Sequence, residues 1–249
     1  MTLADGALIV VAGTLAGIVG TAGGITSLVS YPALLLIGVP PLTANVVNIV
    51  ALVVCGPGSA LASRPELRGR WAWLGRWMLV AAVGGAAGAA LLLLTPSAAF
   101  GQVVPFLIAA GSLVLIAAPK LSARREGSGR HNAVILAVGL LAVSAYSGYF
   151  GAGSGVMALA LLLITVDQNV ARANALKNML VGAATMASAV TLVVFVQVDW
   201  GAVGPLAAGL LAGSLIGPRL ARRVPAAVLR WFAAILGLGL AVKLWISPG

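Results

Sequence analysis

Two short runs of glycine interrupt an otherwise apolar chain, and they are the residues best placed to form a binding site. The glycines of these runs are Gly20, Gly23 and Gly24 in the first, and Gly151, Gly153 and Gly155 in the second. A break of this kind inside a membrane helix exposes backbone N–H and C=O groups that lipid cannot satisfy. The helix that restarts after the break directs its first amides and its positive dipole end at the site. Both breaks therefore favour an anionic ligand.

Close packing between helices is the alternative explanation for glycines that lie four residues apart, because small residues let two backbones approach. We give this interpretation to the pairs Gly84/Gly88 and Gly213/Gly217. For the two glycine runs we favour the binding interpretation, because each run is followed by an unusually short apolar segment.

An asparagine pair follows each glycine run in the next long apolar segment. Asn45 and Asn48 lie on one face of a helix, as do Asn174 and Asn178. Polar side chains inside a membrane span almost always face the interior of the bundle. These asparagines are therefore expected to line a pocket, with hydrogen bonds between helices as the alternative.

Lys177 lies between Asn174 and Asn178, about one and a half helical turns after Arg172 at the start of the same segment. Its ammonium group could reach an anion held between the glycine runs, or its long stem could carry it to the inner membrane surface. Asp and Glu occur only at segment ends or in basic loops, and no phosphate-binding loop or cluster of metal ligands is present. We therefore expect no catalytic residue, no metal, no cofactor and no enzymatic activity.

The composition indicates a membrane protein. Of 249 residues, 61% are hydrophobic and only 8% are charged, whereas soluble domains carry about 25% charged residues. The net charge of +10 arises from cations in short loops between apolar runs. Orientation in the membrane explains such cations better than nucleic-acid binding does, so the expected partners are the lipid bilayer and a small anion.

The two glycine runs belong to a longer internal repeat. The stretch 71–96 reappears at 200–225 at one constant offset, with matching Trp, Gly and Pro residues. We therefore expect two homologous halves, residues 1–125 and 126–249, which together form one transport domain. Paired repeats in so apolar a chain are typical of transporters whose site lies between the halves.

Ten apolar runs are separated by polar or glycine-rich turns, and most have the ~17–25 residues that cross a hydrocarbon core. The runs are 3–19, 25–37, 43–62, 71–94, 98–118, 132–150, 154–166, 170–197, 200–218 and 225–246. We therefore predict an all-α polytopic membrane protein with about five segments in each half and Gly-rich helix breaks. The second and seventh runs are short, so the sequence leaves open whether they cross completely.

Basic residues indicate how the two halves are oriented. The connecting segments 64–70 and 219–223 contain several arginines. The segments that match them in the repeat, 195–199 and 90–94 respectively, contain no basic residue. In an inverted repeat, matching segments lie on opposite sides of the membrane, and basic residues are enriched only in the cytoplasmic one of each pair. We therefore predict inverted halves in the cytoplasmic membrane, with both chain ends outside. If the two short segments were re-entrant, each half would instead cross four times.

Several motifs resemble those of the sulfite exporter TauE/SafE family of membrane permeases. They are GIVGTAGG at 17–24, Tyr31-Pro32, GVP at 38–40 and Ala44-Asn45, then GYFGAG at 148–153 and RANALKN at 172–178. The resemblance extends from about residue 5 to residue 245. The second half has Leu163, or its neighbour, in place of a match to Pro32, so the two half-sites are not equivalent.

The resemblance implies transport of sulfite, thiosulfate, organosulfonates or other small organic acids across the cytoplasmic membrane. We therefore expect a secondary permease or exporter of small anions, with sulfite or organosulfonate-type sulfur oxyanions as the substrates. The alternatives are an anion channel, an uptake permease for a small organic acid, and a membrane scaffold that transports nothing. The sequence does not decide the anion, the direction, a coupling ion or the oligomeric state.

Overall fold

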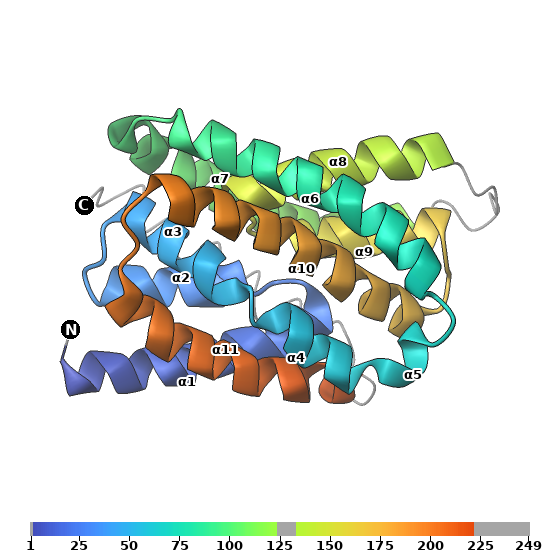
Figure 1. Ribbon diagram of the computed structural model, residues 1–249, viewed down its shortest axis with the longest axis horizontal. Helices are drawn as coiled ribbons and strands as arrows, with labels where there is room; N and C mark the ends of the chain where they lie inside the picture. The colour runs from blue at the N-terminus through green and yellow to red at the C-terminus, as the bar shows by residue number, and fades with distance from the viewer. Residues whose placement is uncertain (1, 124–132, 222–249) are drawn as a thin grey trace.

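Helices joined by short turns make up the computed structural model, which describes residues 2–123 and 133–221 (Figure 1). The helices are α1 (Leu3–Gly23), α2 (Ser27–Leu36), α3 (Pro41–Leu52), α4 (Cys55–Ala62), α5 (Arg64–Leu67), α6 (Trp71–Leu93), α7 (Ser97–Ala123), α8 (Ala133–Tyr149), α9 (Ser154–Thr165), α10 (Val170–Phe195) and α11 (Trp200–Ala221). The described part of the chain contains no strand, so the prediction of an all-α protein is confirmed.

Each predicted apolar run up to residue 218 corresponds to a helix or, in one case, to two. The tenth run, 225–246, lies outside the described residues, as do the basic residues Arg124, Arg125 and Arg130. Five stretches are long and apolar enough to cross a membrane: α1, α3 with α4, α6, α10 and α11. The chain is therefore a multi-pass membrane protein.

The helices begin and end where local sequence signals place them. Thr2 caps α1, because its side chain accepts a hydrogen bond from the amide of Asp5 while the Asp5 carboxylate accepts one from the amide of Thr2. Gly24 ends α1 in the left-handed conformation, with φ of 81°, which glycine adopts without steric cost. Asn169 caps α10 by accepting a hydrogen bond from the amide of Arg172.

The α2 and α9 helices are too short to cross the membrane alone. They have 10 and 12 residues, which at about 1.5 Å per residue gives roughly 15–18 Å, or half of a ~30 Å hydrocarbon core. Each starts at a glycine run within the bundle. Figure 1 shows α2 joining α3 at the left-hand end, and α9 leading to the start of α10 at the right.

Two pairs of long helices, each formed by segments that are not adjacent in sequence, make extensive contacts. The α1 helix packs along α11, and α6 packs along α8. Figure 1 shows α1 and α11 running from left to right, whereas α6 and α8 run from right to left. Between these pairs, α10 contacts α3, α4 and α6, and α11 contacts α3 and α4.

Glycines make both of these pairings close. A Cβ atom on Gly84 would lie 2.7 Å from the carbonyl oxygen of Leu141 in α8. A Cβ atom on Gly213 would lie 2.8 Å from the amide nitrogen of Ile18 in α1. Gly84 and Gly213 therefore allow close helix packing, as we expected from the spacing of the glycine pairs.

One helix break was not predicted from the sequence. The run 43–62 was expected to form a single helix, but α3 ends at Leu52 and α4 begins at Cys55. Pro57 explains the interruption, because proline has no N–H to donate to the carbonyl four residues earlier and its ring crowds that carbonyl. Proline is tolerated in the first turn of a helix, which is where Pro57 lies in α4.

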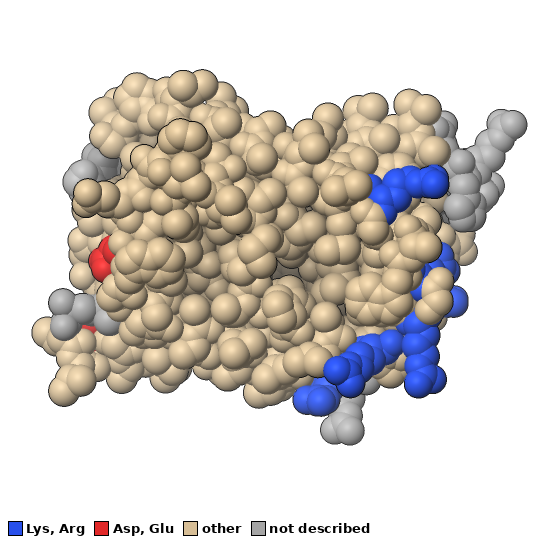
Figure 2. Space-filling view, viewed as in Figure 1, with Lys and Arg blue, Asp and Glu red and all other residues tan. Residues whose placement is uncertain are grey.

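Basic side chains gather at one end of the long axis of the molecule. On the face shown in Figure 2, Lys and Arg gather at the right-hand end and Asp and Glu lie at the left. The right-hand end carries the α5 region and the start of α10, and the left-hand end carries the amino terminus (Figure 1). The exposed arginines of the described residues include Arg64, Arg68, Arg76, Arg172 and Arg219.

Candidate functional site

The two glycine runs, which lie 131 residues apart at Gly24 and Gly155, touch each other inside the bundle. A Cβ atom on Gly24 would lie 2.7 Å from the amide nitrogen of Val156, and one on Gly155 would lie 2.7 Å from the carbonyl oxygen of Gly24. Only residues without side chains allow so close an approach. The structure therefore brings the amino-terminal ends of α2 and α9 to a common point.

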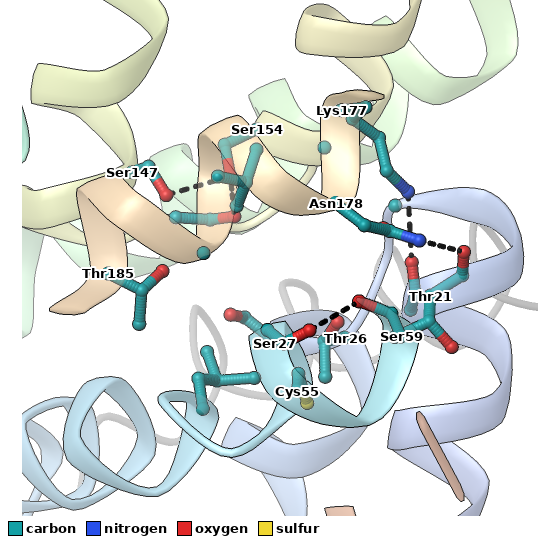
Figure 3. A pocket seen from close by; sticks show the side chains of 18 of the residues that line it. Thr21, Thr26, Ser27, Cys55, Ser59, Ser147, Ser154, Lys177, Asn178 and Thr185 are labelled. Carbon is teal, nitrogen blue, oxygen red and sulfur yellow. Dashed lines mark hydrogen bonds between the residues drawn. The ribbon is translucent and has the colours of Figure 1, made fainter. Parts of the chain in front are cut away.

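A cavity of about 60 Å³ lies at this point. Since one water molecule needs roughly 10–15 Å³, the cavity has room for about four to six waters or for one small anion. Helices α1, α2, α3, α4, α8, α9 and α10 all contribute to its wall. The polar residues that line it are Thr21, Thr26, Ser27, Ser59, Ser147, Ser154, Lys177, Asn178 and Thr185 (Figure 3).

Lys177 is the charged residue of this lining, and its side chain is only 1% exposed. Its Nζ atom donates a hydrogen bond of 3.3 Å to the carbonyl oxygen of Gly20, near the end of α1. The described residues supply no ion-pair partner for it. A cation is favoured at the carboxyl end of a helix, and the position beside the cavity leaves the ammonium group available to an anion.

Asparagines from α10 fix the same end of α1. The Nδ2 atoms of Asn174 and Asn178 donate to the carbonyl oxygen of Thr21, over 2.9 Å and 3.0 Å. Asn178 also lines the cavity, whereas Asn174 lies behind this wall. The Oδ1 atom of Asn174 is buried without a hydrogen-bond partner.

The first asparagine pair, Asn45 and Asn48, forms hydrogen bonds that hold helix ends next to the cavity. Asn45 donates to the carbonyl oxygen of Tyr149, at the end of α8, over 2.8 Å. Asn48 donates to Ser27 and accepts from Ser30, so it holds the start of α2. Neither asparagine lines the cavity; both orient the elements that do.

The glycines of the two runs also divide into two groups. Gly20, Gly24, Gly151 and Gly155 line the cavity. Gly23 and Gly153 lie next to it without lining it: Gly23 is the last residue of α1, and Gly153 precedes α9 with φ of 76°.

Two components of the lining were not predicted from the sequence. Hydroxyl groups from Thr21, Thr26, Ser147 and Ser154 face the cavity, but isolated serines and threonines are too common in membrane helices to carry a signal. The start of α4 also faces it through Cys55. The Gly-Pro-Gly sequence at 56–58 was a usable signal for that helix start.

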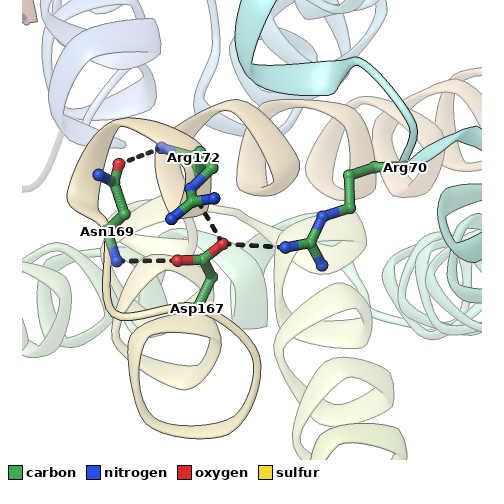
Figure 4. Close-up of polar contacts among 4 residues, drawn as sticks. All are labelled: Arg70, Asp167, Asn169 and Arg172. Carbon is green, nitrogen blue, oxygen red and sulfur yellow. Dashed lines mark hydrogen bonds and ion pairs between the residues drawn. The ribbon is translucent and has the colours of Figure 1, made fainter.

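An ion-pair network joins the turn between α9 and α10 to the residue before α6 at the arginine-rich end (Figure 4). The Oδ2 atom of Asp167, in the turn between α9 and α10, lies 3.1 Å from Arg70 and 3.2 Å from Arg172. The Asp167 side chain is 9% exposed, and its other oxygen accepts the amide of Asn169 over 2.9 Å. Arg70 precedes α6, so the network connects segments distant in sequence.

Comparison with known proteins identifies the family. The profile of the family described as sulfite exporter TauE/SafE matches residues 6–244. The chain belongs to the TauE/SafE sulfite exporter family. TauE/SafE proteins are membrane transporters, which agrees with the long apolar helices and with a site enclosed by both parts of the chain.

A relative from Haemophilus influenzae (strain ATCC 51907 / DSM 11121 / KW20 / Rd) is similar over nearly the whole length. It is described as a probable membrane transporter protein and is 27% identical over 250 residues, covering 98% of this chain and 95% of the relative. No solved structure matches this TauE/SafE chain.

Proposed function

We propose that this TauE/SafE protein is a secondary transporter that carries one small anion at a time through its central cavity, with sulfite and organosulfonates as the first candidates. The observation that supports the proposal is the meeting of two helix breaks, one from each part of the chain, beside buried Lys177. The ammonium group of Lys177 favours a negative ligand, and the helix starts at the cavity supply backbone amide donors. Discontinuous helices near the middle of the membrane are typical of transporter sites.

The proposal includes two inverted halves, residues 1–125 and 126–249. Supporting it, helices that match in the repeat, such as α1 and α8, run in opposite directions in Figure 1. The gathering of arginines at one end supports placing that end in the cytoplasm, with both chain ends outside the cytoplasmic membrane (Figure 2).

Transport by purified protein in liposomes tests the proposal. Radiolabelled sulfite, thiosulfate, an organosulfonate and oxalate are each supplied as substrate, and counterflow against unlabelled anion is measured. Saturable flux with counterflow indicates a carrier, whereas flux that does not saturate indicates a channel. Accumulation of oxalate in preference to the sulfur anions indicates an organic-acid permease, and protein that moves none of them is a scaffold.

A variant pair connects the flux to the cavity. Lys177→Gln removes the ammonium group while keeping a similar side-chain length, and we expect apparent affinity to fall about 10- to 150-fold, as for loss of a charged hydrogen bond. Arg219→Gln, the same chemical change at an exposed arginine of α11, is the matched control and should retain the wild-type affinity. Equal affinities for the two variants would show that the transported anion does not bind beside Lys177.

A further inference from the structure

The cavity contains one charged side chain. Of the lining residues, Lys177 alone can carry a positive charge, and the others are hydroxyl, amide, thiol, glycine or apolar residues. The ion pairs of Asp167 with Arg70 and Arg172 are not part of the lining. Arg172 precedes Lys177 by five residues on α10, or about 7.5 Å along the helix.

The helix ends at the cavity come in pairs of opposite sign. The break around Gly24 brings the end of α1 and the start of α2 to the cavity, and the break around Gly153 does the same for α8 and α9. The break before Cys55 adds the end of α3 and the start of α4. Since a helix carries about +0.5 charge at its start and −0.5 at its end, these contributions largely offset each other. The net charge of the site is therefore close to that of Lys177.

The apolar part of the wall requires an anion to lose most of its water. Ile49, Leu52, Phe150 and Val181 line the cavity together with the polar groups. These side chains cannot replace a hydration shell. An anion that enters is therefore stabilised mainly by the ammonium group and by the hydroxyl and amide groups on the polar side.

From this charge balance we propose that the cavity selects singly charged anions and rejects dianions of the same size and shape. This inference rests on the proposed function and specifies its substrate class. One negative charge beside Lys177 forms a neutral buried pair, whereas a second negative charge would be buried without a partner, which is strongly unfavourable. For sulfur compounds, the preferred substrates are monoanionic sulfonates and the monoprotonated form of sulfite.

Tetrahedral anions that differ in charge provide the test. Perchlorate and sulfate have nearly the same shape and carry one and two charges, and methanesulfonate is a second monoanion with a methyl group in place of one oxygen. Each is used as competitor and as counterflow substrate in proteoliposomes with wild-type protein. We expect perchlorate and methanesulfonate to be accepted, and sulfate to be weaker by about 100-fold or more, as expected for an unpaired buried charge.

Variants of Lys177 test whether its positive charge causes the preference for monoanions. Lys177→Arg keeps the charge and should keep the preference for monoanions, and Lys177→Gln should lower perchlorate affinity about tenfold or more. The exposed control Arg219→Gln should leave the ratio of perchlorate to sulfate unchanged. Size-exclusion profiles in detergent establish that each variant is folded.

The outcomes separate this inference from the proposed function. Comparable acceptance of sulfate and perchlorate, with both weakened in Lys177→Gln, would overturn charge selection and leave anion transport standing. A preference for monoanions that persists in Lys177→Gln would also overturn it, because the selection would then have another origin. Failure of every anion to show saturable flux would overturn the proposed function and this inference together.

Discussion

Replacing Gly24 by alanine tests directly whether the two helix breaks touch. Gly24 has φ of 81°, and an added Cβ atom would lie 2.7 Å from the amide nitrogen of Val156. Alanine in this left-handed conformation costs about 1–2 kcal/mol, and forcing extra volume into a packed site costs about 1–3 kcal/mol more. We therefore expect Gly24→Ala to lower the free energy of unfolding by about 2–5 kcal/mol.

Gly38 provides a matched control for the conformational part of this cost. Its φ is 82°, and nothing lies within 4 Å of a Cβ atom built on it. Gly38→Ala should therefore lose only the conformational term, about 1–2 kcal/mol. The difference between the two variants isolates the cost of crowding, about 1–3 kcal/mol.

Equilibrium unfolding in mixed micelles, followed by tryptophan fluorescence, measures both variants. We also expect Gly24→Ala to impair anion flux, because the start of α9 must shift to accommodate the methyl group. Gly38→Ala should transport normally. Equal destabilisation of the two variants would refute the contact between the breaks.

In a Cys55→Ala background, a cysteine at Gln168, in the α9–α10 turn, should be shielded from impermeant thiol reagents in intact cells, while one at Ser97 should react; the reverse pattern would contradict the proposed orientation. Asp167→Asn should destabilise the fold by about 1–2 kcal/mol, a buried ion-pair loss discounted for the partial exposure of both arginines, and unchanged stability would show that the network contributes nothing. Asn48→Ala should cost about 1–3 kcal/mol by removing its buried hydrogen bonds with Ser27 and Ser30. It should not change which anions are preferred, so a changed preference would place Asn48 in contact with substrate.

The sequence was sufficient for the fold class because membrane spans depend on composition and length, which are local. The glycine runs at Gly24 and Gly155 were also recognisable, since a break in an apolar run is a local feature. Their mutual contact is not local: it depends on how α1, α8 and their partners pack, and no periodicity within either run specifies it.

The spacing of the asparagines predicts which side of the helix they occupy but not which groups they contact. Asn48 and Asn178 both lie on inward-facing helical positions, yet one holds the start of α2 and the other lines the cavity. Spacing determines which face of a helix a residue occupies, but the neighbour it meets there is determined by tertiary packing. The interruption between α3 and α4 has a local cause, because Pro57 removes a backbone donor within an otherwise continuous apolar run.

Protection of Cys55 by a bound anion is the most direct test that the cavity is the anion site. Cys55 lines the cavity and is the single cysteine of the chain, so N-ethylmaleimide reports on this position without background from other thiols. Methanesulfonate does not react with thiols, and we expect it to slow the labelling of wild-type protein in a saturable way. It should not slow the labelling of Lys177→Gln at the same concentrations. Labelling of wild-type protein at the same rate with and without saturating anion would contradict the account.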